Sequence, residues 1–121
     1  MSAEENRAIA RRIIEAYNRH DVSALDGLIA GDYVYYRGPR MAVAGRSLAE
    51  FKERVRGFFT AMPDYRMTIE DMVAEGDRVA LRYTVHGTRE GKQVTISGID
   101  IGRLADGMYV ESWAVAESIA D

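Results

Sequence analysis

At Pro63 and Asp64 the spacing of apolar residues changes from a helical period to that of strands, which divides the sequence into a mainly helical part, with one short strand, and a β part. Before this point, apolar side chains recur every three to four residues, which is the period of one helix face. After it they alternate with polar side chains, which is the period of a strand with one buried face. Proline supplies no amide donor and restricts the residue before it, so no helix is expected to cross the boundary.

Two helices are predicted before residue 31. Ser2 and Glu5 have the spacing of a capping box, in which each side chain bonds the other residue's backbone amide at a helix start. A helix is therefore expected over about residues 3–19. Asp21 is placed to cap a second, short helix, which Gly31 is expected to end.

A short aromatic strand and a third helix are predicted next. The strand covers residues 33–37 and stops at Gly38–Pro39, and residues 40–46 are expected to form an irregular loop. Ser47 then repeats the capping-box spacing and opens a helix with an apolar face. This third helix is expected to end at Met62, since proline follows.

The β part predicts an antiparallel meander of four strands. Its turns carry Glu75-Gly76-Asp77 and Asp106-Gly107, which are strong hairpin signals between alternating runs. The four predicted strands cover residues 65–74, 78–86, 92–104 and 108–117. Three helices, a short strand and this meander predict an α+β domain in which helices cover one face of a bent sheet.

The third strand of the meander carries the most informative side chain, Asp100. Alternation places it on a face that is otherwise apolar, so ionisation is costly and its pKa is expected to rise. Gly98 and Gly102 stand two residues away on either side, and their missing side chains are expected to leave open space. A carboxyl group with a raised pKa beside an apolar gap indicates a proton-transfer site. The alternative is an edge-strand aspartate that faces water.

Composition limits the classes of function. A chain of 121 residues fits a single domain, and a net charge of −3 without any run of Lys or Arg predicts no nucleic-acid or membrane partner. No cysteine is present and only two histidines are, which is too few for a transition-metal site. The N-terminal residues lack a signal-peptide pattern, so a cytoplasmic location is expected.

Several short strings in this order resemble one known family. They are Tyr17-Asn18-Arg19-His20-Asp21, Met62-Pro63-Asp64, Ala74-Glu75-Gly76-Asp77-Arg78, His86-Gly87-Thr88, Gly98-Ile99-Asp100 and Glu111-Ser112-Trp113. Together they resemble the SnoaL-like polyketide cyclases, whose fold is that of nuclear transport factor two. The resemblance covers residues 1–121 as one domain. It implies a cone-shaped roll with three N-terminal helices packed on a strongly curved, mostly antiparallel sheet, and a homodimer.

The resemblance also implies site residues. Asp100 matches the general acid/base of the cyclases, and His86, on the preceding strand, matches the histidine that assists it. Alternation alone would bury Val79, Leu81, Tyr83 and Val85 and leave His86 in water. The family architecture implies instead that His86 faces the pocket and that the opposite apolar face packs against a second subunit.

The implied reaction needs neither cofactor nor metal. Asp100 would remove a proton from carbon flanked by carbonyl groups, the enolate would attack a second carbonyl group of the same polyketide or keto ester, and the proton would return. Arg82 is a candidate for added positive charge. The remaining candidates for contact with a small hydrophobic or aromatic substrate are Tyr17, Tyr33, Tyr35, Phe51, Phe59, Met62 and Trp113.

Three other functions remain open. A ketosteroid isomerase would need a second carboxylate where Arg37 stands and a tyrosine where Ile13 stands. An epoxide hydrolase of this fold would need carboxylates where Thr84 and Val115 stand. A module that only binds a ligand or a second copy is the non-catalytic alternative, and in it Asp100 would pair with a surface cation.

Overall fold

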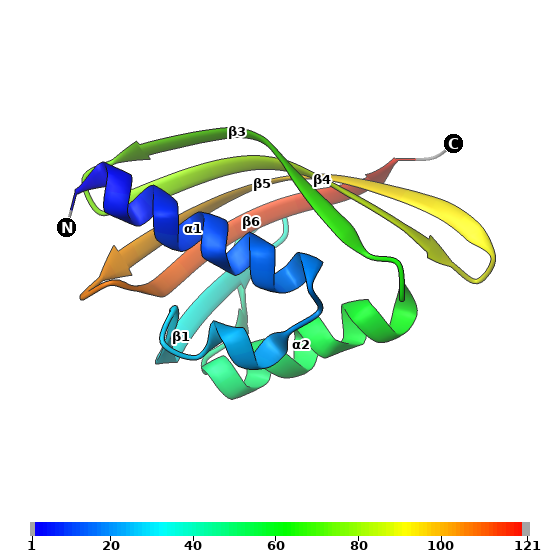
Figure 1. Cartoon of the computed structure of the whole chain (residues 1–121), viewed down its shortest axis with the longest axis horizontal. Coiled ribbons are helices and arrows are strands. Elements are labelled where there is room, and N and C mark those ends of the chain that lie inside the picture. The colour runs from blue at the N-terminus through cyan, green and yellow to red at the C-terminus, as the bar shows by residue number, and fades with distance from the viewer. Residues whose placement is uncertain (1, 120–121) are drawn as a thin grey trace.

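The structure is a computed structural model that describes residues 2–119. Its elements run α1 (Ala3–Asn18), the 3-10 turn η1 (Val22–Leu25), β1 (Ile29–Arg37), β2 (Ala42–Gly45), α2 (Leu48–Ala61), β3 (Arg66–Glu75), β4 (Arg78–Arg89), β5 (Lys92–Ala105) and β6 (Met108–Ile119) (Figure 1). No helix of the described residues is long and apolar enough to span a membrane.

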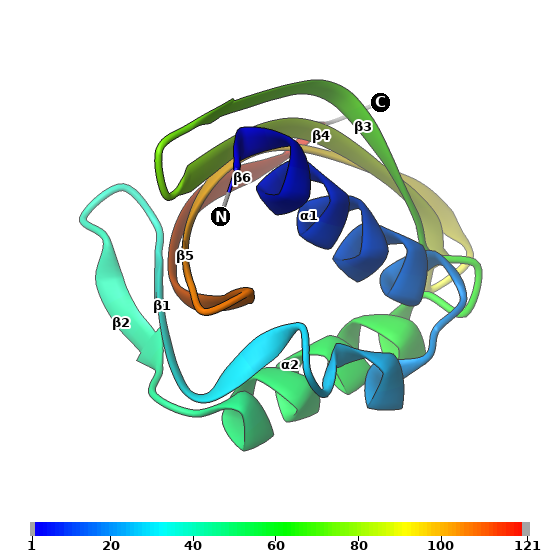
Figure 2. The ribbon, with the colours of Figure 1, turned by 60° about the vertical axis from the view of Figure 1, so that its left-hand side comes forward.

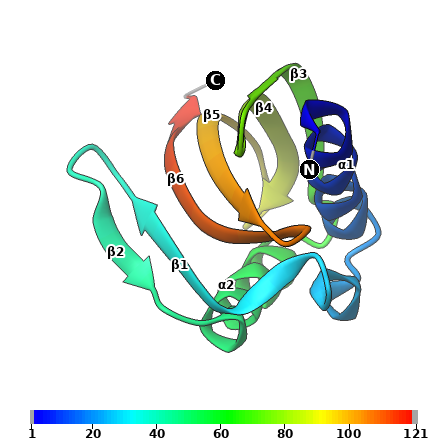
Figure 3. The ribbon, with the colours of Figure 1, turned by 90° about the vertical axis from the view of Figure 1, so that its left-hand side faces the viewer.

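The strands form one six-stranded sheet in the order β2-β1-β6-β5-β4-β3. All neighbouring pairs are antiparallel except β1 and β6, which run parallel. The sheet curves around α1, and α2 lies across the opening below it (Figure 2). The predicted α+β class is confirmed, as is the four-strand meander of β3 to β6 (Figure 3).

The two long helices begin as the sequence predicts. Ser2 and Glu5 form a reciprocal capping box at the start of α1, and the Ser47 hydroxyl accepts a bond from the Glu50 amide at the start of α2. Helix α2 ends at Ala61, directly before Met62 and the proline. Helix α1 packs on β3 and β4, whereas α2 packs on β1.

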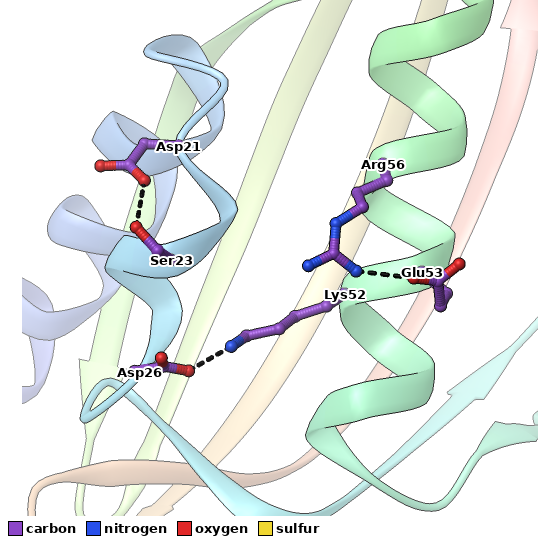
Figure 4. Close-up of polar contacts among 6 residues, drawn as sticks. All are labelled: Asp21, Ser23, Asp26, Lys52, Glu53 and Arg56. Atoms are coloured by element: carbon purple, nitrogen blue, oxygen red, sulfur yellow. Dashed lines mark hydrogen bonds and ion pairs between the residues drawn. The ribbon is translucent and has the colours of Figure 1, made fainter.

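The predicted second helix is wrong. Only the single 3-10 turn η1 forms, and the Asp21 carboxylate bonds the Ser23 hydroxyl at 2.6 Å instead of capping a backbone amide (Figure 4). Gly31 lies inside strand β1, which begins earlier than expected because Ile29 pairs with Tyr109 of β6. An ion pair between Asp26 and Lys52 then joins this segment to α2.

The predicted loop over residues 40–46 is also wrong in part, since it contains strand β2. Gly45 pairs with Tyr35 of β1, and a Cβ atom at this position would lie 2.4 Å from the Tyr35 ring. The segment has no long alternating run of its own. Its strand conformation depends on pairing with β1 and on the aromatic ring that occupies the space above the glycine.

Candidate active site

Asp100 lies on the concave face of β5, at a cavity between the sheet and α1. The cavity is about 50 Å³ in volume, and its walls are apolar and aromatic. They include Ile13, Tyr17, Tyr33, Leu81, Tyr83 and Tyr109. Asp100 pairs with Leu81 across the ladder, so the two share a face. The predicted placement of Asp100 among hydrocarbon is therefore confirmed.

The pKa of Asp100 is raised to about 6. Burial is the main cause, because an apolar surround disfavours the charged carboxylate, and the positive charge of Arg37 opposes part of this rise. No hydrogen bond from a described residue stabilises the ionised form. The carboxyl group thus has a pKa suited to accept and return a proton near neutral pH.

The two glycines beside Asp100 do not leave open space as predicted. A Cβ atom on Gly98 would lie 2.4 Å from the Tyr83 ring, and one on Gly102 would lie 2.2 Å from the Tyr109 ring. Each glycine therefore lets a tyrosine ring lie directly against β5. The two rings form walls of the cavity on either side of Asp100.

Arg37, at the end of β1, is the charged neighbour that the sequence reasoning missed as a site residue. It lines the cavity, and its buried Nε has no hydrogen-bond partner among the described residues. Burial would lower the pKa of this guanidinium, but Asp100 and the surrounding tyrosines raise it overall. Arg37 also acts on Tyr83. Burial raises the pKa of Tyr83, and the positive charge of Arg37 offsets part of that rise.

The tyrosines of the cavity stay protonated at neutral pH. Burial raises the pKa of Tyr17, Tyr33 and Tyr109, and Asp100 adds to the rise in each. The Tyr33 hydroxyl bonds that of the buried Ser112. These phenol groups supply aromatic walls and hydroxyl groups without adding negative charge.

A wider second chamber adjoins the cavity. It has a volume of about 320 Å³ and shares Tyr17, Arg37, Met67 and Tyr83 with the inner cavity. These four residues form the junction, and we call the wider space the outer chamber. Its remaining walls include Phe58, Met62, Tyr65, Val85 and Ile96, together with the charged side chains Arg54, Arg89 and Glu117. This volume is within the range of small-molecule sites.

The predicted position of His86 in the pocket is wrong. Its side chain is exposed on the convex face, where a ring nitrogen lies 3.4 Å from the Thr95 hydroxyl. Asp100 pairs with Leu81, five residues before His86, and an odd separation along a strand places two side chains on opposite faces. Val79, Leu81, Tyr83 and Val85 are buried inside, as alternation alone indicated.

Arg82 and Trp113 also lie outside the cavity. Arg82 is exposed and pairs with Asp71 at 2.7 Å, and Trp113 stacks on Tyr36 with Arg78 above its ring. Both side chains line a groove on the convex face of the sheet. Their predicted contact with substrate is wrong, because their strand positions point away from the helices.

The other predicted contact residues divide into two groups. Tyr17 and Tyr33 line the inner cavity, and Met62 lines the outer chamber. Tyr35 and Phe51 are buried behind Tyr33, with ring centroids 5.0 Å apart, while Phe59 stacks on His20 at 4.2 Å. These last three residues support the walls and do not line either chamber.

Comparison with known proteins agrees with this architecture. Residues 10–112 match the family model described as a SnoaL-like domain. AclR from Streptomyces galilaeus, provisionally named a hydroxylase, is 29% identical over 96% of this chain and 91% of its own, with a TM-score of 0.86. IdmH from Streptomyces antibioticus, provisionally named a polyketide cyclase, is 24% identical over 93% and 91%, with a TM-score of 0.81. No curated protein matches the chain.

Proposed function

The chain belongs to the SnoaL-like domain family, and from this premise we propose that it is a cofactor-independent enzyme of the cyclase or isomerase kind, with Asp100 as its general acid/base. The observation that supports the proposal most is the position of Asp100. Its carboxyl group borders a cavity with aromatic walls, and its pKa is about 6. A purely structural aspartate would pair with a surface cation. Asp100 forms no ion pair with any residue between 2 and 119, and the positive charge that acts on it is that of Arg37 in the same cavity.

The reaction would begin with proton transfer from carbon. Ionised Asp100 takes a proton from a carbon atom next to a carbonyl group, and the negative charge moves to the carbonyl oxygen as an enolate. The enolate attacks a second carbonyl carbon of the same molecule and forms the new ring bond. Asp100 then returns its proton to the resulting alkoxide, which completes an aldol-type cyclisation of a polyketide or keto ester.

Arg37 would take the place proposed for His86 on the sequence. While Asp100 is ionised, it balances the buried guanidinium charge. When Asp100 becomes protonated, that balance is lost and the enolate oxygen supplies a new negative charge in the same cavity. A fixed cation that meets developing negative charge in an apolar site lowers the barrier, as oxyanion donors do.

The two other enzyme functions have less support. Arg37 and Ile13 do line the cavity, and neither can supply the second carboxylate or the tyrosine of a ketosteroid isomerase. The arginine that an epoxide hydrolase would use, Arg82, lies on the convex face. A module that binds a ligand without turning it over is the remaining alternative, and hydrogen exchange separates it from an enzyme.

Wild-type protein is expected to catalyse exchange of the α-hydrogens of 2-tetralone in D2O, followed by proton NMR. The rate should rise with pH to half of its plateau near pH 6, because the reactive form is ionised Asp100 and its pKa is about 6. His86→Gln should leave the profile unchanged, since His86 is outside the cavity. The same exchange rates, measured against pH with β-keto esters in place of 2-tetralone, extend the test to cyclisation substrates. No exchange above the buffer rate for either class would favour the binding module.

We also propose that a second copy of the chain covers the convex face of the sheet. Ile99, Ile101 and Val115 are 57%, 40% and 41% exposed there, which is unusual for such side chains on adjacent strands. Ile99→Glu is expected to convert a dimer to a monomer in sedimentation equilibrium. Ala61→Glu, which adds the same charge at an exposed position of α2 away from the convex face, should not. A monomeric wild type at micromolar concentration would contradict the proposal.

A further inference from the structure

The outer chamber carries more positive charge than the proposed chemistry uses. Arg54, from the middle of α2, and Arg89, from the end of β4, line it together with Arg37. Arg37 has its role beside Asp100. Neither Arg54 nor Arg89 forms an ion pair with any residue between 2 and 119. Arg56, on the same helix as Arg54, pairs with Glu53.

The charges of the two chambers do not balance. Three guanidinium groups line them, against the carboxylates of Asp100 and Glu117, so one positive charge is uncompensated among the lining residues. Arg54 lies over the Phe58 ring at 5.7 Å from its centroid, a contact that holds its guanidinium against the chamber wall. The surplus charge is therefore at the outer chamber, beyond the junction with the inner cavity.

We propose that the substrate is a monoanion, with a keto group that enters the inner cavity and a carboxylate that Arg54 and Arg89 bind in the outer chamber. The inference rests on the proposed function, because it takes both chambers as the site of one substrate. The inner cavity, at about 50 Å³, holds only the reacting group, and the 320 Å³ of the outer chamber holds the apolar body. A guanidinium group favours a carboxylate because its planar N–H donors match the two oxygens.

A matched pair of ligands tests this proposal directly. One is 4-(4-acetylphenyl)butanoate, which has a methyl ketone, an aromatic body and a terminal carboxylate, and the other is its methyl ester. Isothermal titration calorimetry at low ionic strength should show that wild-type protein binds the acid about tenfold more tightly than the ester. Added salt should reduce the preference, since both arginines are exposed.

Variants then assign the preference to the two arginines. Arg54→Gln combined with Arg89→Gln should bind acid and ester equally, with the affinity for the ester unchanged. Arg56→Gln is the control, because it removes one charge from the same helix without touching the chamber. It should keep the tenfold preference.

The outcomes separate this inference from the proposed function. Asp100→Asn should keep the preference for the acid, so a protein without exchange activity can still support the anion site. Equal binding of acid and ester by the wild type would overturn the inference, as would no binding of the acid at millimolar concentration. A loss of preference in Arg56→Gln as large as in the double variant would also overturn it, because the effect would then be one of overall charge.

Discussion

Asp100→Asn is expected to lower the rate of carbon-acid exchange by about 10²- to 10⁴-fold, the range that one general acid/base contributes. Asparagine has the shape of aspartate and cannot accept the proton. It also removes the cost of an ionised carboxyl group among apolar side chains, so the variant should fold. The rate is measured with 2-tetralone in D2O at pH 7.5, where wild-type Asp100, with a pKa of about 6, is ionised.

Binding supplies the control for this variant. The affinity for the ester ligand should stay within about threefold of wild type, because a residue that acts only in proton transfer affects turnover and not ground-state binding. His86→Gln should retain the full rate. If Asp100→Asn exchanges at more than half of the wild-type rate, Asp100 is not the base and the catalytic account fails.

Gly102→Ala is expected to destabilise the protein by about 1–3 kcal/mol, the usual cost of overpacking a core. The new methyl group would lie 2.2 Å from the Tyr109 ring, which is well inside contact distance. The ring must move, and it is buried at the wall of the cavity. Urea unfolding measures the change in the free energy of unfolding, and the affinity for the ester should fall with it.

Gly31→Ala is the matched control for that substitution. Gly31 is also a strand glycine, but a Cβ atom there would meet nothing within 4 Å. Its effect should stay within about 0.5 kcal/mol, as for an ordinary surface change. Equal stability of Gly102→Ala and Gly31→Ala would mean that Tyr109 does not lie against β5.

Local patterns in the sequence predicted most of the elements. Caps at Ser2 and Ser47 and the proline after Met62 set the helix limits, and alternation set the four strands of the meander. The parallel pairing of β1 with β6 joins segments about 80 residues apart, as Tyr35 with Ser112 shows. No local signal encodes such a contact, so the full length of β1 was missed. Strand β2 was missed for another reason, because its four residues have no alternating run of their own.

The candidate site was predicted only in part. Asp100 was found because one carboxylate stands in an apolar alternating face. His86 was misplaced because the family resemblance was preferred to alternation, although the hairpin register, with Leu81 opposite Asp100, fixes the faces. The same register places Tyr83 opposite Gly98. Because Gly98 has no side chain, the Tyr83 ring lies over it and next to Asp100. Arg37 was noticed only as a mismatch to another enzyme of the fold.

A shared fold does not by itself fix the reaction that a protein catalyses. Structures similar to this chain carry different provisional names, among them a hydroxylase, a polyketide cyclase and a ketosteroid isomerase. Reaction type must therefore follow from the side chains at the cavity. Here these are one carboxyl group, one buried guanidinium and a set of tyrosines that remain protonated.

We expect the Asp100 carboxyl group to keep a pKa near neutrality inside the cavity. A carbon-13 NMR titration of the side-chain carboxyl groups tests it most directly, with the Asp100 signal assigned by its absence in Asp100→Asn. We expect this signal to titrate with a pKa of about 6, well above the value of about 4 that is usual for an aspartate side chain. An Asp100 signal that titrates near 4 would show a solvated carboxylate, and Asp100 would then not be a base with a raised pKa in an apolar cavity.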